Sequence, residues 1–203
     1  MNLDQTNQLN LNNMKIEVKK LIGWGEVLDA ARFTVRKQPL DKADEEVSLK
    51  FKKRMMISEH SPVRLLTFRI RVYDVPKFVI MHLVRHHEGI EKFVCTNRPD
   101  RNGNKTTRHE QHDDDLVNCQ FVCNAQALIN ISKVRLCFKA EKETRELWQE
   151  IQKAIKPVDS VMWEAMVPSC CYRGYCPEDN SCMFHKTKYA KVMRAVAYGD
   201  DKC

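Results

Sequence analysis

The stretch NAQALINISKVRLCFKAEKETR, Asn124–Arg145, carries the pattern that decides the predicted fold. A helix beginning near Cys119 would place four of its residues along one stripe, namely Asn124, Leu128, Ile131 and Arg135, because an eleven-residue spacing is close to a whole number of turns. Apolar residues on this stripe predict packing against a core. An arginine on the same side needs a partner there, and both a ligand and a carboxylate between Glu141 and Glu146 remain open.

Periodicity in the rest of the chain predicts a few strands among several helices. Apolar residues that recur every fourth position predict a helix over residues 44–58, and Asp74 before Pro76 predicts a second over 76–86. Further helices are predicted over 119–139, 140–155 and 188–197, the first two of them nearly continuous. Alternation predicts a half-buried strand over 63–72, and a short strand is expected at 89–94. The segment 96–115 is polar and is expected to be a loop. We therefore predict the α+β class, with a small sheet packed with long helices in a single domain.

The composition indicates the size and bounds of this domain and the cellular compartment expected for the protein. The chain has 203 residues, 43% of them hydrophobic, which is enough for one substantial core. We expect a flexible N-terminal tail over 1–13, the main domain over 14–168, and a cysteine-rich extension of the same domain over 169–203. No membrane-spanning run and no secretory signal is present, so we expect a cytoplasmic protein whose nine cysteines stay reduced.

The formal net charge of +7 favours anionic partners. Nucleic acid, phosphorylated nucleotides and anionic cofactors would all be attracted, but a modest excess spread over the whole chain is more typical of a solvated basic surface without a ligand. The net charge does not distinguish these alternatives, whereas specific sequence motifs can.

Three basic residues, Arg85, His86 and His87, are expected at the end of the 76–86 helix, followed by Gly89. Cationic groups oppose the negative end of the helix dipole, so the cluster has a structural explanation without a ligand. Asn124 and Asn130 offer amides that could hold the edge of a planar ring.

Together, these segments resemble the flavin-dependent thymidylate synthases. The stretch Asn124–Arg145 resembles the helical signature of that family, in which Asn-Ala, a leucine, an arginine and then Ala, Glu and Arg recur at fixed spacing. The stretch VRHHEGIEKFVCTNR is similar to the Arg-His-Arg hallmark followed by a Ser-x-Arg element, and EHSP, Glu59–Pro62, resembles a His-containing turn of the family. The resemblance covers residues 58–168.

The resemblance implies a role for each matching position. It implies flavin contacts for six residues: Arg85, His86, His87, Asn124, Asn130 and His60. It places Thr96 and Arg98 at the nucleotide phosphate, Arg135 at the uracil as the catalytic arginine, and His82 in the substrate site where a glutamine is expected. It also implies FAD as cofactor, dUMP as substrate, NADPH and methylenetetrahydrofolate as co-substrates, dTMP as product, and a homotetramer with shared sites.

The hallmark in this chain diverges from the family pattern. His87 replaces an arginine, and Ile90, Lys92 and Val94 stand where the hallmark has Ser, Asn and Glu. A rebuilt nucleotide pocket leads to a second hypothesis, a related flavin- and folate-dependent pyrimidine nucleotide modification such as hydroxymethylation.

Two further readings come from other residues. Cys170, Cys171, Cys176 and Cys182, with His185 beyond them, could supply zinc ligands, but their spacing fits no standard pattern and favours structural thiols. His109 and His112 beside Asp113–Asp115 are read as a polar loop, so no metal is expected. A nucleic-acid-binding module using TFRIRVY ranks lower, because the strand lacks an aromatic platform for bases.

Overall fold

The computed structural model describes residues 14–96, 98–102 and 110–199. The tail predicted for 1–13, His109 and the last residues of the extension lie outside this part of the chain. Its strands are β1 (Ile16–Ile22), β2 (Thr67–Pro76), β3 (Ile90–Val94) and β4 (Leu116–Asn124). Its α-helices are α1 (Trp24–Phe33), α2 (Leu49–Ile57), α3 (Lys77–Leu83), α4 (Pro99–Asn102), α5 (Ala125–Arg135), α6 (Lys142–Ile155), α7 (Ser160–Ala165), α8 (Ser169–Arg173) and α9 (Lys188–Tyr198).

The four strands form one antiparallel sheet in the order β1-β2-β4-β3. In the centre, Phe68 of β2 pairs with Cys123 of β4 and Ile70 pairs with Phe121. These side chains are buried, whereas the intervening Arg69 and Arg71 are only half-buried. Because successive side chains of a strand point to opposite faces, only one face of the sheet is fully packed.

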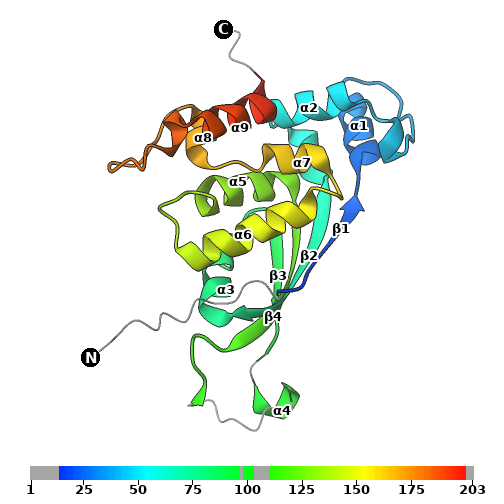
Figure 1. Cartoon of the computed structure of the whole chain (residues 1–203). Helices are drawn as coiled ribbons and strands as arrows, with labels where there is room; N and C mark the ends of the chain where they lie inside the picture. Colours follow the sequence, from blue (N-terminus) through cyan, green and yellow to red (C-terminus); the bar gives the residue numbers. More distant parts are fainter. Residues whose placement is uncertain (1–13, 97, 103–109, 200–203) are drawn as a thin grey trace.

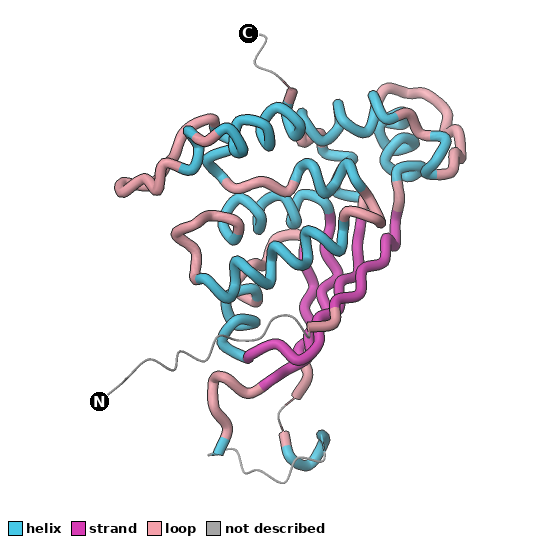
Figure 2. The backbone as a smooth tube through the Cα atoms, in the orientation of Figure 1, coloured by secondary structure: helices cyan, strands magenta, loops and turns pink. Residues whose placement is uncertain are grey.

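Helices cover the packed face in two layers. Figure 1 shows α5 and α6 against the sheet with α3 at one end, while α2, α7, α8 and α9 lie farther out. Figure 2 shows the same arrangement, with strands on one side and helices on the other. A small second cluster of buried residues, Val167, Cys170, Cys171, Ala190 and Ala197, joins α8 to α9. The single α+β domain with a small sheet confirms the predicted fold class.

The predicted helix over 119–139 is wrong in its first part. Residues up to Asn124 belong to β4, where Val117, Cys119 and Phe121 are buried in alternation. The helix begins only at Ala125, because Asn124 accepts a hydrogen bond from the amide of Ala127 (2.9 Å) and caps α5. The chain thus changes from strand to helix at the first residue of the signature stretch.

Three other predicted boundaries differ from the structure. Residues 61–65 form a 3₁₀ turn before β2, and the helix expected over 44–58 is a 3₁₀ turn over 44–46 followed by α2, capped by Ser48. Asp74 does not cap α3, since β2 continues through a bulge to Pro76. The helices α5 and α6 are separate, because Glu141 accepts the amides of Glu143 (3.2 Å) and Thr144 (2.8 Å) and begins a new helix.

The strand at 90–94 and the helices α6 and α9 lie close to their predicted ranges. The strand β1 and the helix α1 had no sequence prediction. No helix in the described ranges is long and apolar enough to cross a membrane.

Candidate functional site

The end of α3 meets the end of α5, and this contact brings the two basic segments together. The Nε of Arg135 donates a hydrogen bond to Nε2 of His86 (3.0 Å), and its Nη2 donates to the carbonyl oxygen of His82 (2.6 Å). His82 and His86 lie half-buried at the contact, while Arg85 and His87 are exposed beside it. Arg135 therefore has its hydrogen-bond partners at the end of α3 and just beyond it, whereas Glu141 acts on it through its charge and forms no ion pair with it among the described residues.

This contact keeps His86 neutral. Burial, followed by the positive charges of Arg135 and Lys92 and by His87, lowers the pKa of His86 from its usual value to about 4. Nε2 accepts from Arg135, so the single proton of the neutral ring lies on Nδ1. Burial and the neighbouring Arg85 lower the pKa of Arg135, yet a guanidinium keeps its charge at neutral pH.

The start of α5 approaches the turn after α3. The amide of Asn124 donates to the carbonyl of Gly89 (2.9 Å), and Gly89 has φ of +69°. A Cβ at this position would lie 2.6 Å from the side-chain nitrogen Nδ2 of Asn124, so both the backbone conformation and the close approach require glycine. The predicted sharp exit at Gly89 is confirmed, although α3 ends at Leu83, earlier than expected.

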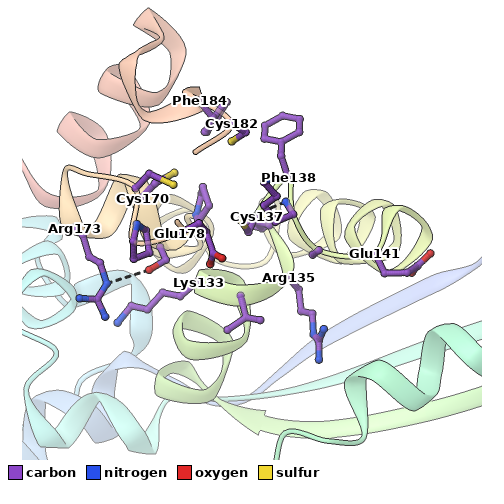
Figure 3. Close-up of a pocket in the computed structure, with 18 of the residues that line it drawn as sticks. Lys133, Arg135, Cys137, Phe138, Glu141, Cys170, Arg173, Glu178, Cys182 and Phe184 are labelled. Carbon is purple, nitrogen blue, oxygen red and sulfur yellow. Dashed lines mark hydrogen bonds between the residues drawn. The ribbon is translucent and has the colours of Figure 1, made fainter. Parts of the chain in front are cut away.

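Two cavities flank α5, and Asn130 lines both. The first has a volume of about 560 Å³ and is shown in Figure 3, with Arg135, Lys133, Cys137, Cys170 and Arg173 among its lining residues. The second has a volume of about 610 Å³ and is lined by Glu59, Arg64, Glu88, Gly89, Asn124, Gln126, Ala127 and Asn130. Neither lining includes Arg85, His86 or His87, but His82 and Arg135 line the first cavity, and Glu88 and Gly89, which follow His87, line the second.

Solved structures share this fold. No protein-family model matches the chain, and no curated protein matches it. The UMP/dUMP methylase PolB from Streptomyces cacaoi bound with 5-Br dUMP aligns with a TM-score of 0.56 at 14% sequence identity, over 75% of this chain and 94% of that chain. Thymidylate Synthase X (ThyX) from Helicobacter pylori with FAD and dUMP aligns with a TM-score of 0.55 at 14% identity, over 75% of this chain and 99% of that chain.

The chain has the fold of these enzymes. The alignment covers nearly the full length of both neighbours and leaves a quarter of this chain outside it. The likeness concerns the fold alone and assigns no role to any residue of the site.

Several predicted site residues lie apart from Arg135 within the subunit. Strand β3 begins opposite Cys123 and runs away from the start of α5, so Thr96 and Arg98 follow its distant end. Both are exposed, and Arg98 pairs with Asp100 through Nε (3.1 Å) and Nη2 (2.8 Å). His60 is exposed at the start of the 61–65 turn and lines neither cavity.

Sequence reasoning missed a polar network along α5. Glu59 accepts hydrogen bonds from Gln126 (2.5 Å) and Lys133 (3.0 Å), and the Lys133 ammonium lies 3.6 Å from the centroid of the Tyr172 ring. Gln126, Asn130 and Lys133 follow helical spacing, which could have identified this face. Glu59 gave no such signal, because it comes from a turn distant in sequence.

The cysteine-rich segment contributes to the first cavity. Cys137, Cys170, Cys176 and Cys182 all line it, and every cysteine in the described part of the chain is a free thiol. Burial raises the pKa of Cys171 to about 12, which makes this thiol unreactive at neutral pH. No group of three or more His, Cys, Asp or Glu side chains is arranged to hold a metal ion in the ranges that the structure describes.

Proposed function

We propose that this chain binds FAD and methylates a pyrimidine nucleotide, converting dUMP to dTMP with methylenetetrahydrofolate and NADPH. The observation that carries the proposal is the 3.0 Å contact between Arg135 on α5 and His86 beyond α3. The resemblance assigns one of these residues to the pyrimidine and the other to the flavin. Two ligands that react with each other have to be adjacent, and this contact supplies that adjacency.

The residues around the second cavity fit a flavin. Asn124 and Asn130 each use the side-chain oxygen within the protein, accepting from Ala127 (2.9 Å) and Gln126 (3.3 Å). Their Nδ2 groups donate no hydrogen bond within the described chain and are available to ring carbonyls. Gly89 lets the Asn124 side chain lie close against the turn, and Arg64 contributes a positive charge to the lining that suits an anionic cofactor.

The residues of the chain would act by orientation and electrostatics. When bound, the flavin supplies the hydride that completes the methyl group. Arg135 uses two of its N–H groups on His86 and His82, which fixes the plane of the guanidinium and leaves the remaining fork free for a pyrimidine carbonyl. A fixed positive charge at that oxygen stabilises the negative charge that develops when C5 of the ring becomes nucleophilic.

The first cavity is a candidate for the nucleotide. Arg135, Lys133, Lys139 and Arg173 contribute cationic groups to its lining, while Phe138 and Phe184 form an aromatic pair with centroids 4.9 Å apart. Phosphate and a planar base would both find complementary groups there. Since Thr96 and Arg98 lie elsewhere in the subunit, their proposed contact with the phosphate requires a neighbouring copy, which fits the homotetramer implied by the resemblance.

A second candidate keeps the flavin but changes the nucleotide or the product. The PolB neighbour is a methylase of both UMP and dUMP. Val94 stands where the hallmark has a glutamate, so the nucleotide pocket differs from the family pattern. The assay should therefore test UMP as well as dUMP as substrate, and should look for a hydroxymethylated as well as a methylated product.

The test is a spectrum followed by a product mass. The purified chain is expected to show the visible absorption of bound flavin. Incubation with NADPH, methylenetetrahydrofolate and either dUMP or UMP is expected to yield a nucleotide heavier by one methylene unit. A gain of a hydroxymethyl group would select the second candidate, and a colourless protein that leaves both nucleotides unchanged after FAD addition would refute both.

A further inference from the structure

Lys92 lies on the face of β3 from which its side chain reaches the segment just after α3. Side chains of a strand alternate, so Lys92 shares its face with Ile90, which is 5% exposed and packed in the core. Lys92 itself is half-buried. Its stem follows this face and its ammonium reaches the chain just beyond the end of α3.

The ammonium has a partner for each of its three N–H groups. It donates to the carbonyl oxygens of Val84 (3.2 Å) and His86 (2.5 Å), and it lies 3.1 Å from Nδ1 of His87. The carbonyls at a helix end lack partners within the helix, and a cation there also opposes the negative end of the dipole. Lys92 therefore provides hydrogen-bond donors to the carbonyl groups of the segment that carries His86 and His87.

The contact also defines the tautomer of His87, while Arg135 defines that of His86. A ring nitrogen that faces an ammonium must accept, so His87 carries its hydrogen on Nε2. His86 accepts at Nε2 from Arg135 and carries its hydrogen on Nδ1. The groups acting on His86 are Arg135 from α5, Lys92 from β3 and its neighbour His87, and none of them is an acid.

We propose that Lys92 is a positioning residue that holds the chain after α3 and fixes the ring of His87, so that His87, together with His86 held by Arg135, presents a neutral hydrogen-bond donor to the bound flavin, the two rings donating from opposite nitrogens. The flavin part of this statement rests on the proposed function. The geometry of Lys92 and of the two rings does not depend on it. The site already holds three positive charges, on Arg85, Lys92 and Arg135. Two charged imidazoles would be repelled by them, so neutral imidazoles are better suited to donate to the carbonyl oxygens of an isoalloxazine ring.

The experiment combines imidazole NMR with flavin titration on the full chain. In the unsubstituted protein, nitrogen shifts are expected to show hydrogen on Nδ1 of His86 and on Nε2 of His87, with the pKa of His86 near 4. In Lys92→Met the stem is kept and the charge is lost, so the pKa of His86 should rise and His87 should lose its fixed tautomer. Flavin should bind about tenfold more weakly, as expected for one charged hydrogen bond.

Two further variants separate positioning from general effects. Lys92→Arg keeps a cation near the carbonyls and should recover part of the flavin affinity. Lys19→Met removes the same charge from an exposed position on β1 and should change neither the histidine shifts nor the affinity. Lys92→Met with unchanged histidine shifts and unchanged flavin affinity would overturn the proposal.

The outcomes also distinguish this proposal from the proposed function. If the unsubstituted protein binds no flavin but shows both tautomers, and Lys92→Met changes the tautomer of His87 and raises the pKa of His86, the proposed function fails and the positioning role of Lys92 stands. If Lys92→Met does not fold, the spectrum of the unsubstituted protein still decides, because hydrogen on Nδ1 of His87 would contradict the contact with the ammonium.

Discussion

At the scale of single residues, Arg135 has the most informative environment. Its bonds to His86 and His82 fix the guanidinium, and Arg135 is one of the residues that line the first cavity. We predict that Arg135→Ala lowers kcat about a hundredfold or more, the cost of losing a donor at a developing negative charge. Bound flavin per mole of protein should stay the same, as measured by visible absorption.

The matched control for Arg135 is Arg54→Ala, which removes an arginine from an exposed position on α2. It should leave turnover and absorption unchanged. Turnover of Arg135→Ala equal to that of the control would remove this residue from the site.

Arg85 provides a cleaner test of flavin binding than a buried residue would. It is exposed, so its replacement leaves no buried group unpaired and should change stability by no more than about 0.5 kcal/mol. If it contacts flavin, Arg85→Ala should purify without colour while keeping the unfolding midpoint of the unsubstituted protein. A fully yellow variant would count against the proposed contact.

The depressed pKa of His86 predicts how stability depends on pH. The unfolded chain binds the proton near the usual pKa of about 6.5, whereas the folded chain resists it down to about 4. The contribution of His86 is therefore complete above about pH 6.5 and is lost progressively as the pH falls through the folded pKa. Urea unfolding between about pH 7 and about pH 4 should show a steeper loss for the unsubstituted protein than for His86→Gln, and equal slopes would contradict the shift.

At the scale of elements, the junction between β4 and α5 combines two roles in Asn124. The side-chain oxygen caps the helix, and the side-chain nitrogen lies at the second cavity. Asn124→Asp keeps a capping oxygen, so we predict an unchanged unfolding free energy but weaker flavin binding. Asn124→Ala loses both groups and should destabilise by about 1 kcal/mol as well.

The capping part of this prediction has its own control. Ser48 caps α2 by accepting from the amide of Phe51 (3.3 Å), away from the site. Ser48→Ala should destabilise by a comparable amount and leave flavin binding intact, both measured by denaturant titration and by absorption. Asn124→Asp with full flavin affinity would show that only the cap matters.

This junction also explains why the sequence misplaced an element. The stripe from Leu128 to Arg135 correctly predicted a helix with a half-buried arginine, because helical periodicity is local. The segment before it, VNCQFVCN, alternates as a strand, but its residues also fit a helix when the pairing partners are unknown. Only the long-range pairing of Phe121 with Ile70 and Lys92 selects the strand.

The candidate site shows the same division between local and distant information. Gly89 and the contact of His86 with Arg135 follow from segments whose patterns are readable in sequence. Other contacts depend on which elements pack against one another. These are the hydrogen bond of Lys133 with Glu59 and those of Lys92 with the chain after α3. Thr96 and Arg98 match the family pattern in sequence, but within one subunit they lie apart from Arg135.

At the scale of the whole molecule, one buried carboxylate connects the first and last parts of the domain. Asp159 accepts from Nε1 of Trp24 (2.8 Å), pairs with the ammonium of Lys20 (2.8 Å) and caps α7 through the amide of Met162 (2.9 Å). Contacts between residues this distant in sequence form only when the whole chain has folded. They hold β1 and α1 against the end of α6 and the start of α7.

Removing this connection should therefore destabilise the fold without altering the chemistry of the site. We predict that Asp159→Ala lowers the free energy of unfolding by about 3 kcal/mol, because Lys20 and Trp24 lose their shared acceptor. Asp159→Asn keeps the cap and an acceptor oxygen and should cost about 1 kcal/mol. Urea unfolding measures both values, and the folded fraction of each variant should bind flavin as the unsubstituted protein does. A loss of flavin affinity in fully folded Asp159→Asn would mean that this junction positions the site as well as supporting the fold.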